Sequence, residues 1–221
     1  MTLNNVTWEI VLVALVIVST VFHELGHGFV ALRLGDPTAK MMGRLTLNPL
    51  RHLDPFGSVV LPLLMALAGG PVFAFAKPVP YNPNNLRNPR RDEVLVALAG
   101  PACNLLQALI GAGAFRLAVS QGVTTLTQTG YVGLSLLASY VYVNLVLMFF
   151  NLIPLPPLDG SKVISPLLKG EARRTYYEIQ RYSMPIMLAI FYLCPMVLGF
   201  NPISAYCSVT AGGLYTLLLG A

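Results

Sequence analysis

The chain has 221 residues, of which 55% are hydrophobic and 10% are charged, and its mean hydropathy is +0.67. A soluble domain carries about 25% charged residues, so this composition excludes an ordinary water-soluble enzyme and indicates one integral-membrane domain over residues 1–221. The net charge of +5 does not indicate nucleic-acid binding, because the basic residues lie between apolar runs rather than along one stripe. The three cysteines form no CxxC pair, so neither a disulfide framework nor a thiolate metal site is predicted.

Apolar runs predict an all-α polytopic membrane fold with about five transmembrane helices. In chain order, the runs cover residues 8–34, 93–119, 131–152, 183–200 and 203–219. The core of the domain is expected at about 8–170, with 183–219 as a C-terminal helix pair. A shorter apolar run at 56–76 is interrupted by Gly69-Gly70-Pro71, which favours a re-entrant hairpin over a full span.

Basic loops predict the orientation of these spans, because Lys and Arg collect on the cytoplasmic side of membrane proteins. The segments 36–55 and 77–91 are both basic, so we expect both on that side, with the hairpin returning between them. This arrangement places the N-terminus and the uncharged loop 121–130 outside. A site near the end of the first span would then lie nearer the cytoplasmic face.

The first apolar run contains His23-Glu24-Leu25-Gly26-His27, an HExxH sequence. Two histidines four residues apart share one helix face, so both rings can bind one Zn²⁺ ion, and Glu24 can act as the general base that activates water. Such residues inside an apolar span are costly without a metal or partners, and are functional by default. The alternative is a hydrogen-bonded polar cluster that joins helices.

A catalytic zinc site needs a third protein ligand. Asp159 follows a proline-rich turn at the inner end of the third span and precedes Gly160, so its carboxylate is mounted on a stiff turn. Asp54, in the first inner loop, is the other candidate. We favour Asp159, and we interpret His52 and Asp54 as a turn with a local hydrogen bond, leaving open a supporting or substrate-contacting role.

Three motifs together resemble the site-2 protease family of intramembrane zinc metalloproteases. They are HELGH at 23–27, Ala-Gly-Pro-Ala-Cys-Asn at 99–104 and Asn-Leu-Ile-Pro-Leu-Pro-Pro-Leu-Asp-Gly at 151–160. The resemblance implies an enzyme that hydrolyses peptide bonds within or near transmembrane segments of membrane-protein substrates in the lipid bilayer. It also implies a compact member without the PDZ domain that many relatives carry.

The same resemblance implies roles for individual residues. It implies that one zinc ion is bound by His23, His27 and Asp159, with Glu24 as the catalytic base. It further implies substrate-binding roles for three residues, Asn104, Asn151 and Pro157. From the residues alone, an Asn in an apolar span often only bonds a neighbouring helix.

An unwound substrate can add to an extended inner segment, so short β segments are expected at Lys40–Leu47 and Val72–Tyr81. Two other functions compete with proteolysis. A metal transporter would need a series of His or acidic residues across the membrane, whereas the sequence offers one cluster. An inactive relative acting as a chaperone would not need an intact HExxH sequence.

Overall fold

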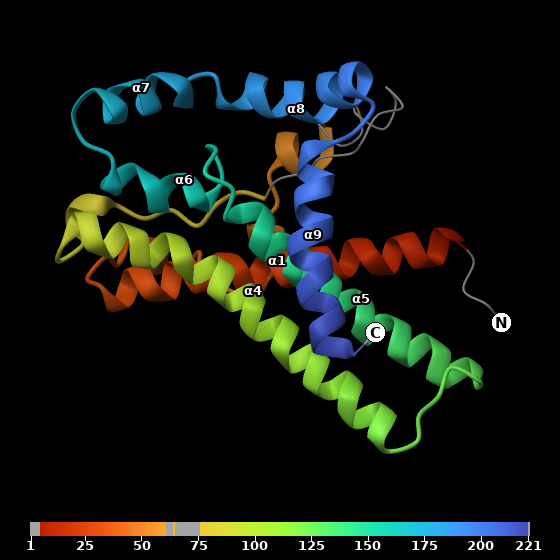
Figure 1. Ribbon diagram of the computed structural model, residues 1–221. Coiled ribbons are helices and arrows are strands. Elements are labelled where there is room, and N and C mark those ends of the chain that lie inside the picture. Colours follow the sequence, from red (N-terminus) through yellow and green to blue (C-terminus); the bar gives the residue numbers. More distant parts are fainter. Residues whose placement is uncertain (1–4, 61–63, 65–75, 221) are drawn as a thin grey trace.

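The computed structural model describes residues 5–60, 64 and 76–220, and long helices dominate this part of the chain (Figure 1). The longer helices are α1 (Asn5–Arg33), α4 (Pro89–Ser120), α5 (Gln128–Asn151), α7 (Gly170–Gln180), α8 (Ser183–Leu198) and α9 (Pro202–Leu219). The shorter ones are α2 (Thr38–Met41), η1 (Pro49–Arg51), the π-helix η2 (Pro55–Val60), η3 (Pro83–Asn85), α6 (Asp159–Ile164) and η4 (Ser165–Leu167).

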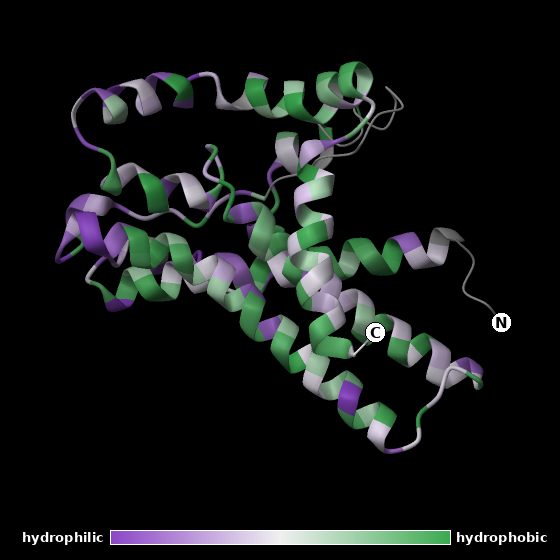
Figure 2. Cartoon of the chain, in the orientation of Figure 1, coloured by the Kyte–Doolittle hydropathy of each residue, from purple (hydrophilic) through white to green (hydrophobic). Residues whose placement is uncertain are grey.

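Within the described residues, four helices are long and apolar enough to cross a membrane, namely α1, α4, α5 and α9. Figure 2 shows hydrophobic residues along most of their length, whereas hydrophilic residues gather at the start of α4 and in the loop before it. Helix α8 has 16 residues, which is shorter than the roughly 20 residues that a span needs. It passes as a span only when paired with α7, from which it is bent by 72°. The expected span at 183–200 is therefore a shorter helix.

The expected β segments are wrong for the part of the chain that the structure describes. Between residues 40 and 47 the chain completes α2 and continues in turns, and residues 76–81 are extended without a ladder partner. Pro78 and Pro80 have no N–H to donate to a ladder, while the N–H groups of Lys77 and Val79 donate elsewhere, to His52 O at 2.8 Å and to Glu24 Oε2 at 2.7 Å. Most of the hairpin predicted at 56–76, and residues 72–75, lie outside the described residues.

The main core forms where α4, α5 and α9 meet. Small residues on α4, Ala108 and Ala112, pack with Val141 and Leu145 of α5 and with Ala211 of α9. Small side chains let helix backbones approach closely, which is how helices associate inside a bilayer.

Helix α1 packs against α4 at the HELGH sequence, and this contact positions the site. A Cβ at Gly26 would lie 2.9 Å from the carbonyl oxygen of Ala99 and 3.2 Å from Cys103 Cβ. Only glycine therefore permits this approach of the two backbones. Helix α6, which begins with Asp159, also packs on α4.

Candidate metal centre

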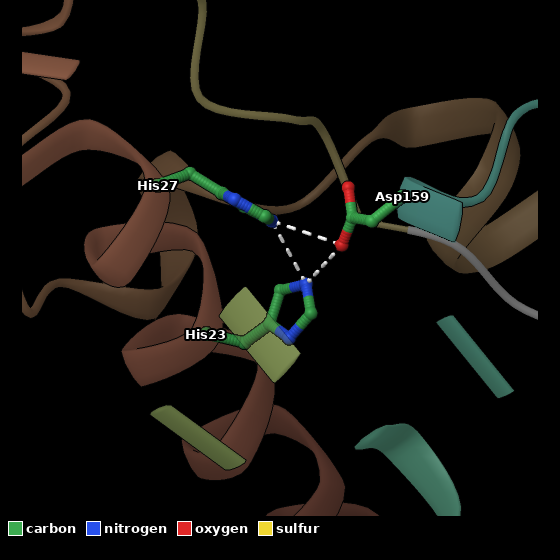
Figure 3. Close-up of side chains that lie close together, drawn as sticks. All are labelled: His23, His27 and Asp159. Carbon is green, nitrogen blue, oxygen red and sulfur yellow. Dashed lines mark hydrogen bonds and ion pairs between the residues drawn. The ribbon is translucent and has the colours of Figure 1, made fainter. Parts of the chain in front are cut away.

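The rings of His23 and His27 and the carboxylate of Asp159 converge between α1 and the start of α6 (Figure 3). His23 Nε2 lies 3.0 Å from His27 Nε2 and 3.0 Å from Asp159 Oδ2. His27 Nε2 lies 3.1 Å from the same carboxylate oxygen. All three residues are buried. His23 and Asp159 are 136 residues apart in the chain, so the tertiary fold builds this cluster.

The spacing of the three donor atoms fits one zinc ion. Zinc binds His nitrogen at about 2.0–2.1 Å in a tetrahedral shell, so neighbouring ligand atoms are roughly 3.3 Å apart. The observed separations of 3.0–3.1 Å are close to that value. Two imidazoles and one carboxylate are also a donor set found in catalytic zinc sites.

The ring of His27 is oriented by the backbone of α4. Its Nδ1 lies 2.7 Å from the carbonyl oxygen of Val96. A carbonyl oxygen only accepts, so Nδ1 carries a proton and donates, and Nε2 is the nitrogen presented to the cluster. A hydrogen bond of this kind fixes the orientation of a metal-binding histidine.

The ring of His23 is oriented by a chain of buried amides. Asn144 Nδ2 donates to the carbonyl oxygen of Tyr140 at 2.9 Å, and this bond fixes which way the Asn144 amide lies. Its Oδ1 accepts from Asn104 Nδ2 at 2.9 Å. Asn104 Oδ1 in turn accepts from His23 Nδ1, so Nε2 of His23 also faces the cluster. Both asparagines are fully buried.

Gly100 provides the space beside the two rings. A Cβ at this position would overlap Nε2 of both His23 and His27. Any other residue would therefore displace the rings or fill the space between them. The residue after Asp159 must also be glycine, because a Cβ at Gly160 would overlap the carbonyl oxygen of Leu152.

A cavity of about 350 Å³ adjoins the cluster and is lined by α1, α5, α6 and residues from the extended segment 76–81. Glu24 lines this cavity together with the three clustered residues. Its Oε2 accepts the Val79 N–H, and the carbonyls of Lys77 and Pro78 next to Val79 accept from Arg44 Nη2 at 2.9 and 3.3 Å. The protein thus holds one oxygen of the Glu24 carboxylate at the edge of the cavity.

Tyr81 and Lys162 also line the cavity. The Tyr81 hydroxyl donates to Glu93 Oε1 at 3.2 Å, and the Lys162 ammonium lies 5.2 Å from the centre of the Tyr81 ring. Burial raises the pKa of Tyr81, and the Glu93 carboxylate raises it further. The phenol therefore stays protonated and continues to donate at neutral pH.

A model of the peptidase family M50 matches residues 11–135 and 119–194 of the sequence. The chain belongs to this family, the site-2 protease family. The M50 assignment confirms the expected family and its zinc cofactor, and the four apolar helices agree with a multi-pass membrane protein.

Several curated relatives also match most of the chain. The Bacillus subtilis protein named "Putative zinc metalloprotease YwhC" is 42% identical over 181 residues, which are 81% of this chain and 79% of the relative. The Mycobacterium tuberculosis protein named "Putative zinc metalloprotease Rip2" is 33% identical over 83% of this chain and 67% of the relative. The Methanocaldococcus jannaschii protein named "Zinc metalloprotease MJ0392" is 28% identical over 75% of this chain and 36% of the relative. No solved structure matches the chain significantly.

The other residues expected in the M50 site fall into two groups. Asn151 and Pro157 line the cavity, and the Asn151 Nδ2 donates to Leu147 O at 2.9 Å. Asn104 does not line it, because its amide lies behind His23. This placement favours an orienting role for Asn104 over the expected contact with substrate.

Asp54, the competing third ligand, lies outside the cluster. Its Oδ1 accepts from the backbone N–H groups of Phe56 and Gly57 at 3.0 and 2.7 Å, at the start of η2. His52 Nε2 pairs with the carbonyl oxygen of Thr46 at 2.8 Å. The interpretation of His52 and Asp54 as locally bonded turn residues is therefore confirmed.

Two residues of the site were not anticipated from the sequence, Asn144 and Gly100. Asn144 carries a signal that could have been used, because a second asparagine in an apolar span needs a partner. Gly100 belongs to a motif that the sequence analysis quoted, but its contact with the two rings depends on how α1 and α4 pack.

Proposed function

We propose that this M50 protein is an intramembrane zinc endopeptidase in which His23, His27 and Asp159 hold the ion and Glu24 is the catalytic base. The observation that carries the proposal is the triangle of three donor atoms, 3.0–3.1 Å apart, with both His Nδ1 atoms engaged behind the rings. A merely structural polar cluster does not require both Nε2 atoms to face one carboxylate oxygen.

The chemistry is hydrolysis of a peptide bond. When bound, zinc supplies a Lewis acid that lowers the pKa of water and polarises a carbonyl group. Glu24 takes a proton from the attacking water while the water oxygen bonds to the carbonyl carbon of the substrate. The same carboxyl then gives this proton to the amide nitrogen as the C–N bond breaks, which leaves a free acid and a free amine.

Glu24 is oriented for this role by the Val79 amide. The N–H of Val79 holds Oε2 at 2.7 Å, which limits the rotation of a flexible side chain at the edge of the cavity. A base must lie within hydrogen-bond reach of the proton that it removes. The contact with Val79 therefore favours one productive orientation of the carboxylate.

The substrate proposed for this site is a segment of a membrane protein that has been unwound locally. Val16 and Thr20 of α1 and Leu147 and Phe150 of α5 line the cavity, so its wall on the span side is mostly apolar. Asn151 lies at the end of this wall with its Nδ2 on Leu147 O, and we assign its Oδ1 to accept a substrate N–H. Pro157 also lines the cavity.

The proposed orientation places the catalytic end of α1 nearer the cytoplasm, because the loops 36–55 and 77–91 are rich in Lys and Arg. Substrate segments would then be cut toward their cytoplasmic ends. A protease-protection assay with tags in 121–130 and 36–55 tests the orientation separately from catalysis.

The decisive experiment compares the wild-type protein with Glu24→Gln in liposomes that contain a single-pass substrate. We expect cleavage to fall by roughly 10²- to 10⁴-fold, the usual contribution of a general base, while the zinc content stays at one ion per chain. Glu9→Gln is the matched control, since Glu9 is exposed near the other end of α1. Cleavage by Glu24→Gln at the wild-type rate would refute the assignment of the base.

A further inference from the structure

A second cavity, of about 420 Å³, lies beside the 77–81 segment and shares Pro78 with the active-site cavity. Three basic residues line it, Arg44, Arg51 and Lys77. Among the described residues that line it, none is acidic. In the described part of the chain, no Asp or Glu forms an ion pair with any of the three cations.

The burial of Arg44 distinguishes this cavity from a cluster of exposed surface cations. It is only 7% exposed, and its Nη2 donates to the carbonyls of Lys77 and Pro78. Its Nε is buried and has no hydrogen-bond partner among the described residues. A buried guanidinium without a counter-ion is costly, and a buried donor without a protein partner calls for a specific cause, of which a bound water or ion is one.

We infer that this basic cavity binds a phosphate-bearing anion. Guanidinium groups present forked N–H donors that match phosphate oxygens, and an ammonium such as that of Lys77 adds a compact positive charge. The nearby acids do not compete for these cations. Asp54 accepts from the start of η2, and Asp36 accepts from backbone and side-chain donors around it.

The rim of the cavity favours a phospholipid headgroup as the source of this phosphate. Met42 and Leu50 line the same cavity and are 59% and 73% exposed. Exposed apolar side chains next to cations are typical of segments at the membrane surface, where basic pockets hold anionic headgroups. Free phosphate offers the same charged group without acyl chains, so the two sources can be separated by experiment.

The test uses the full-length protein in nanodiscs of phosphatidylcholine, with or without phosphatidylglycerol, and native mass spectrometry to count retained lipids. Arg51→Ala combined with Lys77→Ala removes two exposed cations and spares the buried Arg44. Each cation near a membrane surface is worth roughly fivefold in affinity, so we expect the double variant to retain phosphatidylglycerol roughly 25-fold more weakly. Lys40→Ala with Arg90→Ala is the matched control, because both residues are exposed and neither lines the cavity.

A parallel arm titrates inorganic phosphate against the thermal stability of the protein in detergent. Selective retention of phosphatidylglycerol that the double variant loses and the control keeps supports the headgroup site. Stabilisation by inorganic phosphate, lost in the same variant, with no lipid retained, supports the anion site and assigns it a soluble ligand. Equal retention of both lipids, or equal binding by wild type and double variant, overturns the inference. Neither readout depends on proteolysis.

Discussion

Replacing Asn144 by Leu should weaken zinc binding at the proposed site, although the Asn144 side chain hydrogen-bonds to Asn104, Ser19 and Tyr140 and does not line the cavity. The substitution removes the acceptor to which Asn104 Nδ2 donates and the donor to Ser19 Oγ, whereas Tyr140 O lies within α5 and loses only an additional side-chain donor. Each buried polar group left without a partner costs about 1–3 kcal/mol. The Asn104 amide is then free to turn, and His23 loses the fixed acceptor behind its Nδ1.

Hydrogen bonds behind a metal ligand are typically worth 10- to 100-fold in affinity. Because Asn144 acts through Asn104, we expect a loss of about tenfold for Asn144→Leu and a larger loss, toward 100-fold, for Asn104→Leu. Competition with a zinc-binding dye in detergent measures both. Ten- to 100-fold corresponds to about 1.4–2.7 kcal/mol, which matches the loss of one buried hydrogen bond to the ring.

Gln107→Leu is the control for this prediction. Gln107 is buried on α4 one turn after Asn104, and it bonds Ser19 O and the Tyr140 hydroxyl but not His23. Its loss should lower the melting temperature without changing zinc affinity. Equal zinc affinity for wild type and Asn144→Leu, or an equal loss for Gln107→Leu, would refute the argument that the amide chain orients His23.

Two further predictions concern Gly100 and Asp36. Gly100→Ala should abolish zinc binding because its Cβ overlaps both rings, whereas Gly113→Ala on the same helix should bind zinc normally, since a Cβ there meets nothing within 4 Å; dialysis followed by metal analysis distinguishes the two. Burial raises the pKa of Asp36, but hydrogen bonds from Thr38, Asn85 and Asn82 outweigh it and hold the pKa below its usual 3.8. The ionised carboxylate therefore stabilises the fold above pH 3.8, and this contribution is lost as the pH falls through the lowered pKa. Asp36→Asn should accordingly cost about 1 kcal/mol at neutral pH, and its melting temperature should approach that of wild type in acid; a constant difference at every pH would contradict this account.

The central residues of the site could be predicted because their signals are local. The spacing of His23 and His27 places two rings on one helix face, and that face is what the structure presents to Asp159. Asp159 could be preferred over Asp54 because a stiff turn precedes it, and the structure brings only Asp159 into the cluster. Both the shared helix face of the two histidines and the turn before Asp159 are set by residues that lie close together in the sequence.

The remaining features depend on how distant segments pack, and the sequence carried weaker signals for them. The direction of the Asn104 amide is set by Asn144, 40 residues away on another helix. The extended segment at 77–81 was expected to pair as a strand, but its donors and acceptors are taken by Glu24, His52 and Arg44. Pro78 and Pro80 indicated an extended chain, but they did not indicate which groups would bond to it.

The histidine rings of the cluster and the Glu24 carboxylate are oriented by different parts of the molecule. The two histidines proposed as zinc ligands are oriented by Asn104 and by Val96 O, which lie on α4, a helix long and apolar enough to span a membrane. Glu24 is oriented by Val79, whose segment is held by Arg44 outside the spans. Changes in the amide chain should therefore alter zinc affinity, whereas changes in the 77–81 segment should alter turnover while zinc stays bound.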